Sequence, residues 1–394
     1  MQDQLWDVIA VVPASLEAEA VAELEALGAQ APQPLRRAVR CRMDRAGFYR
    51  AHLQARLPFQ LLRLLAHFPC ASRAQLYRGV QQAADWQGWL PPQLSFRVEA
   101  SGKAGELNHS HFTALQVKNA LVDAQRDLWG KRSSIDLDDP DLSLHLHLGR
   151  GEAQLSLDGS GGSLHRRGYR AAMGLAPLKE NLAAGLMAIT GWDGSVPLVD
   201  PFCGSATLLI EAVSRVLSRA PGLLPGSALG PAHHAQARRF SCLQWPDADL
   251  GVWRSEVVAA AEQALAGSQQ PLAPVIGLEQ DPEVLEQARS NVAAAGLEAW
   301  IDLRQGDGCE LMPPPGPGVL VCNPPYGERL GDEQVLDGLY HRFGRQLKDH
   351  CSGWSLWLLS GNAKLTRALG MKASRRVPVS NGGIDCRWLH YEIR

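Results

Sequence analysis

Short apolar runs alternate with amphipathic stretches through the second half of the chain. The runs at 196–200, 275–279 and 319–322 are typical of buried strands, and the stretches at 207–218 and 282–295 carry apolar residues at helical spacing. Strands that alternate with helices predict a doubly wound, mostly parallel α/β sheet. The pattern also predicts helices at 177–190, 251–266 and 333–349 and strands at 301–304, 355–359 and 386–393.

The first half of the chain reads as smaller α/β layers. Its first elements follow the order strand, helix, strand, helix, strand, which resembles a ferredoxin-like layer, at 5–12, 15–28, 37–43, 44–57 and 59–68. Two runs of alternating polarity, 142–148 and 153–157, are joined by a glycine-containing turn and predict a hairpin. The pattern further predicts helices at 72–83 and 110–129, a strand at 94–100 and a linker at 158–163.

The composition indicates a folded protein with a large core. The chain has 394 residues, of which 45% are hydrophobic, and its 11 tryptophans exclude a disordered sequence. No run of about 18 uncharged apolar residues occurs, so no membrane span is expected, and the first residues lack the features of a signal peptide. The eight cysteines are scattered without Cys-x-x-Cys or zinc-ligand spacing. We therefore expect reduced thiols, no metal site and a cytoplasmic protein.

The charge pattern places local basic clusters on a nearly neutral chain. The formal net charge is −2, and neither half is strongly basic. Three arginine-rich clusters occur, at 36–45, 165–170 and 367–376. The planar fork of arginine suits bidentate contacts to phosphate, although solvated surface clusters have the same composition. The cluster at 165–170 is the best candidate for binding phosphate.

The segment Asp200–Glu211, with the sequence DPFCGSATLLIE, joins the strand at 196–200 to the helix that follows. An acid ends the strand, small residues let the loop approach a ligand, and the free N–H groups of the helix point at that ligand. Ligands of open α/β sheets bind at this carboxyl edge. The segment is not G-x-G-x-x-G and contains no Walker lysine, which disfavours a phosphate site.

This spacing resembles motif I of the class I methyltransferases that use S-adenosylmethionine. Ala206 stands at a position that is usually glycine in that motif. The resemblance implies that Asp200 holds the methionine ammonium of the cofactor, directly or through water. Phe202, Gly204 and Thr207 belong to the same cofactor-binding motif.

Two further strand ends carry acids at positions that complete such a site. Glu279 ends the second strand, where these enzymes bind both ribose hydroxyls with a carboxylate. Asp281 is the alternative ribose ligand, and it also suits capping the helix that starts at Pro282. Asp307 ends the third strand, where an acid would accept a hydrogen bond from the adenine amine. A turn aspartate beside glycine is the other interpretation of that position.

The sequence Asn323-Pro-Pro-Tyr326 directly follows the strand at 319–322 and is the most specific feature of the chain. Two prolines hold the backbone extended and remove two N–H donors. The Asn323 side chain and the Pro324 carbonyl can then accept the two N–H bonds of an exocyclic nucleobase amine and orient its lone pair. Tyr326 offers a face on which the base can stack. The pattern predicts amine methylation without a strong general base.

Other chemistries fit the sequence less well. Methylation of a pyrimidine carbon needs a cysteine nucleophile, and Cys322 lies beside the motif, but its position inside the strand favours packing. A serine hydrolase of the α/β class needs a G-x-S-x-G elbow, which is absent. His233 and His234 are interpreted as a surface pair rather than as metal ligands.

Four segments together resemble the THUMP-domain ribosomal RNA methyltransferases, and the resemblance extends over nearly the whole chain. These segments are Leu164–Arg170, Ala176–Ala183, Asp200–Glu211 and Asn323–Leu330. The resemblance implies three domains: a ferredoxin-like domain at 1–60, a THUMP RNA-binding domain at 61–165, and a Rossmann-like class I methyltransferase domain with a seven-stranded sheet at 166–394.

The same resemblance implies a reaction and a partner. The expected reaction transfers a methyl group from S-adenosylmethionine to the N2 amine of a guanine in 23S rRNA. Lys118 in the expected THUMP helix, together with Arg166, Arg167 and Arg170, is expected to contact the RNA. Because the chain stops at Arg394, the second methyltransferase of the fused members of this family is expected to be absent.

Three alternatives remain open from the sequence. Asn-Pro-Pro-Tyr serves adenine and guanine amines alike, so adenine-N6 methylation is one of them. Guanine-N2 methylation of tRNA, which related THUMP enzymes perform, is another. A different class of function, an RNA-binding assembly factor with a vestigial cofactor site, is opposed by the intact acids at 200, 279 and 307.

Overall fold

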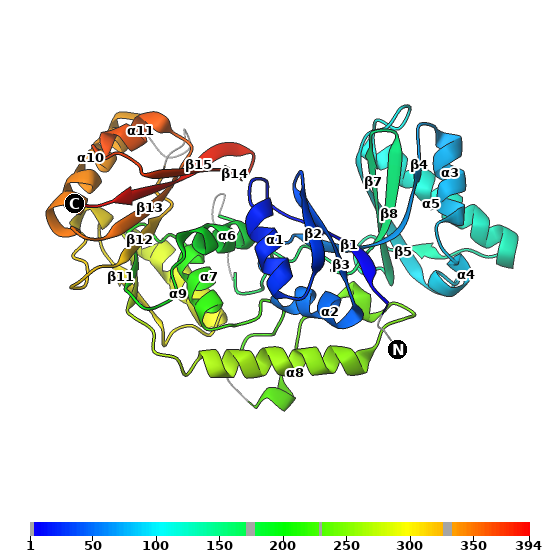
Figure 1. Ribbon diagram of the computed structural model, residues 1–394, viewed down its shortest axis with the longest axis horizontal. Helices are drawn as coiled ribbons and strands as arrows, with labels where there is room; N and C mark the ends of the chain where they lie inside the picture. Colours follow the sequence, from blue (N-terminus) through cyan, green and yellow to red (C-terminus); the bar gives the residue numbers. More distant parts are fainter. Residues whose placement is uncertain (1–3, 171–177, 228–230, 326–332) are drawn as a thin grey trace. The chain divides into compact units, whose positions relative to one another are not determined.

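The computed structural model describes residues 4–170, 178–227, 231–325 and 333–394 (Figure 1). They form two compact units. The first contains residues up to 12, 21–164 and 238–256, and the second contains 13–20, 165–237 and 257–394. The sequence predicted domains that are continuous along the chain. The structural units are discontinuous instead, because residues 13–20 belong to the second unit and residues 238–256 belong to the first.

One eight-stranded sheet forms the centre of the first unit. Its strand order is β2-β3-β1-β4-β8-β7-β5-β6. The strands are β1 (Trp6–Val11), β2 (Gln30–Leu35), β3 (Ala38–Met43), β4 (Gln60–Pro69), β5 (Ser95–Gly102), β6 (Ser134–Ile135), β7 (Leu142–Gly149) and β8 (Glu152–Asp158). Because β4 pairs with both β1 and β8, the predicted ferredoxin-like and THUMP layers share one sheet.

The helices of the first unit pack on this sheet. They include α2 (Arg45–Gln54), α3 (Arg73–Gln82), α4 (Trp86–Trp89) and α5 (Ser110–Trp129), and α1 (Glu17–Ala26) begins in the second unit. Figure 1 shows α3 and α5 on one side of β7 and β8. Alternate leucines of those strands, such as Leu144 and Leu157, are buried, which fits a sheet with one apolar face.

The segment predicted as a linker, 158–163, is in part a packed strand end. Asp158 and Ser160 are buried. The Asp158 carboxylate accepts the side-chain amide of Gln60, and the Ser160 hydroxyl accepts the backbone N–H of Leu61. Asp158 and Ser160 therefore accept hydrogen bonds from a side chain and a backbone N–H of β4. The small polar residues of this segment thus have a structural role, and a flexible linker is not needed to explain them.

The second unit contains a seven-stranded sheet in the order β11-β10-β9-β12-β13-β15-β14. The strands are β9 (Leu198–Asp200), β10 (Val275–Glu279), β11 (Ile301–Gln305), β12 (Val319–Cys322), β13 (Ser355–Ser360), β14 (Arg375–Asn381) and β15 (Ile384–Glu392). The first five in that order are parallel, and β15 is antiparallel to both of its neighbours. The predicted doubly wound, mostly parallel sheet is confirmed, and β14 is a strand that the sequence pattern did not predict.

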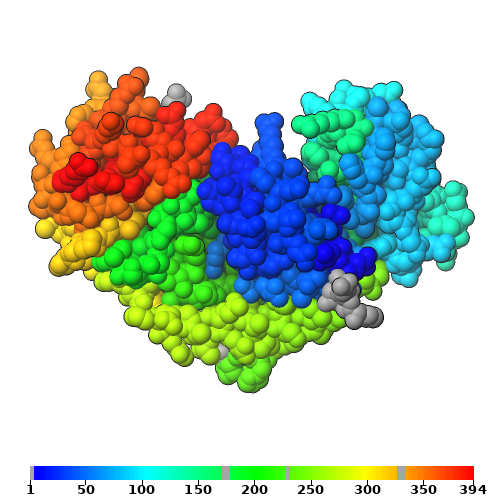
Figure 2. All heavy atoms as spheres, viewed as in Figure 1, coloured from blue at the N-terminus to red at the C-terminus, as the bar shows by residue number. Residues whose placement is uncertain are grey.

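Helices connect these strands in the predicted order, with one addition. They are α6 (Glu180–Thr190), α7 (Thr207–Val216), α8 (Leu250–Gly267), α9 (Pro282–Ala294), α10 (Glu333–His350) and α11 (Ala363–Ala368), with short 3-10 turns at Ala232–His234, Ser241–Leu243 and Gly308–Glu310. The sequence pattern did not predict α11. In Figure 2 the orange-to-red atoms of α10, α11 and the last strands form one continuous surface.

Helix α10 is held against the sheet by an apolar stripe. Leu336, Tyr340, Phe343 and Leu347 recur every three or four residues and are all buried. Gly344 lies on the same side, and a Cβ atom added there would approach the Leu369 carbonyl oxygen to 2.3 Å. The glycine is therefore required for the close approach of α10 to the end of α11.

A pair of glycine substitutions in α10 tests this packing. Gly344→Ala should destabilise the protein by about 1–3 kcal/mol, because the added methyl meets backbone that cannot move aside cheaply. Gly338→Ala, in the same helix but with open space at its Cβ position, should stabilise it by about 0.5–1 kcal/mol through helix propensity alone. Chemical denaturation of both variants is the measurement, and equal effects would contradict the packing argument.

Candidate active site

The predicted functional residues meet because their strands are parallel neighbours. Strand β9 lies between β10 and β12 in the sheet and runs parallel to both. Their carboxyl ends therefore open on the same edge of the sheet, where Asp200 ends β9, Glu279 ends β10 and Asn323 follows β12. The structure thus brings together the residues that the sequence assigned to one site.

Asp200 is a buried acid without a cationic partner in the described part of the chain. Its side chain is almost completely inaccessible, with the residue 1% exposed, and one carboxylate oxygen accepts the Phe202 N–H at 3.1 Å. The pKa of Asp200 is raised to about 8, mainly by burial and to a smaller extent by the nearby Glu279 carboxylate, while the hydrogen bond from the Phe202 N–H opposes the increase. A buried carboxyl in this state is stabilised in its charged form when a cation binds beside it.

Glu279 accepts hydrogen bonds from the loop that follows β9 and from the loop that follows β10. One of its carboxylate oxygens accepts the Gly204 N–H at 3.1 Å, and the other accepts the Asp281 N–H at 2.9 Å. Asp281 instead caps α9, accepting the Glu283 N–H at 2.8 Å. The capping interpretation of Asp281 therefore holds, and Glu279 is the acid that faces the loop of residues 200–206.

The loop after β9 leads into helix α7, which begins in an unusual way. Ala206 is the N-cap of α7 and adopts a left-handed conformation with φ 62° and no capping side chain. That conformation is unfavourable for alanine, which explains why glycine is usual at this position of the motif. Gly204 is also left-handed, with φ 51°, and a Cβ atom there would meet nothing within 4 Å, so the loop is open on that side.

Phe202 and Thr207, the other predicted cofactor residues of this loop, make internal contacts. The Phe202 ring packs edge to face on Phe343 of α10, with ring centroids 4.9 Å apart. The Thr207 hydroxyl lies 3.0 Å from the Ser205 hydroxyl and accepts a hydrogen bond from Arg170. The Thr207 side chain is buried, so its contacts are with the loop and with Arg170 inside the protein.

Asp307 lies at the end of β11, and α10 supplies a partner for it that the sequence reading missed. One carboxylate oxygen accepts the Cys309 N–H at 2.9 Å and caps a short 3-10 turn. The other oxygen lies 3.3 Å from the guanidinium of Arg342. Arg342 is 35 residues away in sequence, and no motif marks it, so only the packing of α10 against this loop brings the two together.

Asn323 presents an acceptor that has no partner in the described structure. Its side-chain oxygen is buried without a hydrogen bond among the described residues. Pro324 beside it is buried and has no N–H, while the Pro325 carbonyl accepts the Tyr340 hydroxyl at 3.4 Å. A buried acceptor that is left unsatisfied is costly, which makes it a candidate for binding a donor from a ligand. Tyr326, the predicted stacking residue, lies outside the described residues.

Two of the four residues predicted to contact RNA form ion pairs within the protein instead of standing free at the surface. Arg167 pairs with Glu211 and Arg170 pairs with Glu180, and the two arginine side chains are only 4% and 12% exposed. Guanidinium groups that are paired and largely inaccessible are less suited to contact an RNA phosphate than exposed ones. Arg166 is exposed, and Lys118 is partly exposed on α5, so those two remain available as RNA contacts.

The alternative chemistries gain no support from the structure. No group of three side chains suited to a metal ion occurs within the described residues. The described helices include none that is long and apolar enough to cross a membrane. Cys322 is fully buried at the end of β12, and burial raises the pKa of its thiol well above the usual range.

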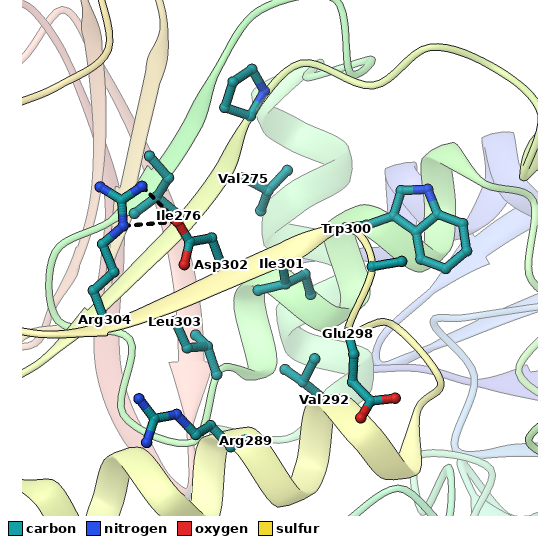
Figure 3. Close-up of a pocket in the computed structure, with 12 residues that line it drawn as sticks. Val275, Ile276, Arg289, Val292, Glu298, Trp300, Ile301, Asp302, Leu303 and Arg304 are labelled. Atoms are coloured by element: carbon teal, nitrogen blue, oxygen red, sulfur yellow. Dashed lines mark hydrogen bonds and ion pairs between the residues drawn. The ribbon is translucent and has the colours of Figure 1, made fainter.

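A hollow of about 520 Å³ lies elsewhere in the second unit. It is lined by β10, the edge strand β11 and the end of α9 (Figure 3). Arg304 and Asp302 form an ion pair on one side of it, and Ile301, Leu303 and Val292 form an apolar side. None of the residues that end β9, β10 and β12 lines this hollow, so it is distinct from the candidate site.

Comparison with protein families identifies two matching regions. Residues 167–390 match the RMKL-like methyltransferase domain, and residues 70–158 match the THUMP domain. A Synechocystis protein provisionally named an RNA methyltransferase is 42% identical over 386 residues, which cover 98% of this chain and 96% of the relative.

Longer relatives match over one part of their length. The ribosomal RNA large subunit methyltransferase K/L of Ectopseudomonas mendocina is 37% identical over 397 residues, which cover 99% of this chain and 53% of that protein. The chain therefore spans about half the length of the K/L relatives that it matches.

Solved structures match the chain along nearly its whole length. SMU.472, provisionally described as a methyltransferase and crystallised in complex with SAH, has a TM-score of 0.86 and 28% identity, covering 100% of this chain and 99% of that one. A protein of Listeria monocytogenes, described as a predicted N6-adenine-specific DNA methylase, has a TM-score of 0.85 and 27% identity, covering 99% and 97%.

The burial of Cys322 generates a direct test. All eight cysteines are free thiols and buried, so iodoacetamide at pH 8 should label the native protein far more slowly than the urea-unfolded protein, which should take up eight labels. Mass spectrometry of peptides identifies each labelled position. Rapid labelling of Cys322 in the native protein would restore the nucleophile interpretation that its burial disfavours.

Proposed function

The chain belongs to the RMKL-like methyltransferase family and carries a THUMP domain, and on this premise we propose that it methylates the N2 amine of a guanine in 23S rRNA, using S-adenosylmethionine. The K/L relatives named for the ribosomal large subunit support the rRNA substrate. An enzyme with this substrate would work in the cytoplasm.

The residues at the edge of the sheet fit the cofactor. S-adenosylmethionine would supply a methyl group on a positively charged sulfur. Asp200, buried and without a cation beside it in the described residues, would hold the ammonium of the methionine part. Glu279 would accept the ribose hydroxyls with the lone pairs left free by its two backbone contacts. Asp307, steadied by Arg342, would accept the adenine amine.

The observation that carries the proposal is the buried, unsatisfied oxygen of Asn323. An exocyclic amine is a poor nucleophile because its lone pair is delocalised into the ring. Hydrogen bonds from the amine to Asn323 and to the Pro324 carbonyl would draw its nitrogen toward a tetrahedral shape and orient the lone pair. No protein base is needed, since the methylated ammonium product is acidic and loses its proton to water.

The first unit would dock the RNA. The THUMP match at 70–158 lies wholly within it. Lys118 on α5 of that unit, and Arg166 near the start of the second unit, are the predicted RNA contacts that the structure leaves accessible. Phosphate contacts of this kind position the RNA, whereas Asn323 would bind the amine of the target base.

A second candidate is adenine-N6 methylation. The Listeria neighbour, described as a predicted N6-adenine-specific DNA methylase, favours it at 27% identity. Both amines present two N–H donors, so Asn323 and Pro324 do not separate them. Incubating the protein with labelled S-adenosylmethionine and separate pools of rRNA, tRNA and DNA, then mapping the modified nucleotide, distinguishes the candidates. Labelling of DNA alone would overturn the rRNA proposal.

Two alanine variants should separate cofactor binding from catalysis. Asp200→Ala should abolish binding of S-adenosylhomocysteine, because it removes the anion that faces the ammonium. Asn323→Ala should leave that binding largely intact and lower kcat on the order of 10²–10³-fold, since it removes only an acceptor for the reacting amine. Calorimetry and turnover assays measure the two effects. Loss of ligand binding in Asn323→Ala would show that its role is wrongly assigned.

The raised pKa of Asp200 predicts a pH dependence. An acid with a pKa of about 8 is mostly neutral at pH 6, and the ammonium needs its charged form, so affinity for S-adenosylhomocysteine should rise with pH. The increase should be roughly tenfold from pH 6 to pH 7 and should level off above pH 8. Asp200→Asn should bind weakly with no such slope. A flat profile in the unaltered protein would contradict the burial argument.

A further inference from the structure

A network of largely buried charged side chains is connected to the loop of residues 200–206 through Thr207. It contains Arg167, Arg170, Glu180 and Glu211, which form two ion pairs with nitrogen-to-oxygen distances of 3.5 and 3.2 Å. The Tyr169 hydroxyl adds a hydrogen bond to Glu211 at 3.0 Å. Two positive and two negative groups thus balance, as buried charges must.

Arg170 differs from the rest of the network because it contacts the starts of two helices. Its guanidinium donates to the Thr207 hydroxyl at 3.1 Å and to the Leu178 carbonyl, and it pairs with Glu180. Thr207 is the first residue of α7, and Glu180 is the first residue of α6. One side chain therefore ties the beginnings of α6 and α7 together.

The contact with Thr207 continues into the loop. The Thr207 hydroxyl lies 3.0 Å from the Ser205 hydroxyl, and the Ser205 carbonyl accepts the Asn291 side chain at 3.1 Å. These bonds lead from Arg170 to the turn that holds Gly204 opposite Glu279. The backbone of the loop is thereby anchored by contacts other than the one that Glu279 makes with Gly204.

Helix α7 needs such an anchor because its own start is poorly stabilised. The N-cap is a left-handed alanine with no capping side chain, whereas serine, threonine, aspartate or asparagine is usual there. A cation near a helix N-terminus opposes the helix dipole, so Arg170 is not placed there to stabilise the dipole. Its charge is offset by Glu180, and what remains is a fixed donor for Thr207.

We propose that Arg170 is a positioning residue for the loop of residues 200–206, holding Thr207 and the strained turn before it in the shape that takes the methionine end of the cofactor. The choice of ligand rests on the proposed function, whereas the anchoring of the loop does not. Arg170 acts through Thr207 and touches neither RNA nor the reacting amine.

Arg170→Lys is the informative variant, since it keeps the charge and loses the fork that reaches Thr207, Leu178 and Glu180 together. Hydrogen–deuterium exchange of the ligand-free protein should show faster exchange confined to the amides of 203–208. Affinity for S-adenosylhomocysteine, measured by calorimetry, should fall on the order of tenfold, as for the loss of a hydrogen bond to a charged group. RNA affinity and its salt dependence should not change.

Arg166→Ala is the matched control, because Arg166 is exposed four residues earlier. It should lower the salt slope of RNA binding by about 0.7–0.9 and leave loop exchange and ligand affinity unchanged. Thr207→Val keeps the shape of the side chain and removes the hydroxyl. It should also show faster exchange confined to 203–208, so the proposal can be tested even if Arg170→Lys fails to fold. The double variant should be no worse than either single one if both act through one contact.

The outcomes separate the two proposals. Unchanged exchange at 203–208 in both Arg170→Lys and Thr207→Val, or a reduced salt slope in Arg170→Lys, would overturn the positioning role. In another outcome, the unaltered protein fails to bind S-adenosylhomocysteine while the two variants still show faster exchange at 203–208. That result would support the anchoring of the loop and overturn the proposed cofactor.

Discussion

The parallel pairing of β9 with β10 on one side and β12 on the other is the constraint on which the site depends. Parallel strands end at the same edge, so residues separated by more than forty positions in sequence are gathered without any special contact between them. Asp200, Glu279 and Asn323 owe their proximity to this register. Loops and helices then only refine a geometry that the sheet has already imposed.

The site and its support differ in how their polar groups are satisfied. Asp200 is buried without a cation in the described residues, and the Asn323 oxygen is buried without a donor there, so both groups retain capacity to pair with a ligand. Arg170 and Glu180, by contrast, are buried and paired with each other. The distinction separates polar groups that lack a partner among the described residues from polar groups that are paired within the protein.

The first unit shows how long-range pairing can merge elements that look separate in sequence. Strand β4 pairs with β1 on one edge and with β8, some ninety residues later, on the other. The Asp158–Ser160 end of β8 fastens back onto β4 through Gln60 and Leu61. The THUMP domain and the layer that precedes it therefore form one structural body with a common sheet. Helices α3 and α5 lie on that sheet.

The sequence by itself determined the alternation of strands and helices, the acids at the strand ends and the Asn-Pro-Pro segment, because each of these is written in local periodicity or in neighbouring residues. The cap formed by Asp281 before Pro282 is equally local. Only the tertiary structure decided the pairing of Arg167 and Arg170, which look like a basic surface cluster in sequence but pair with Glu211 of α7 and Glu180 of α6. The same holds for Arg342 beside Asp307 and for β4 beside β8. Burial and pairing across the chain depend on which elements pack together, and a pattern of nearby residues carries no record of that choice.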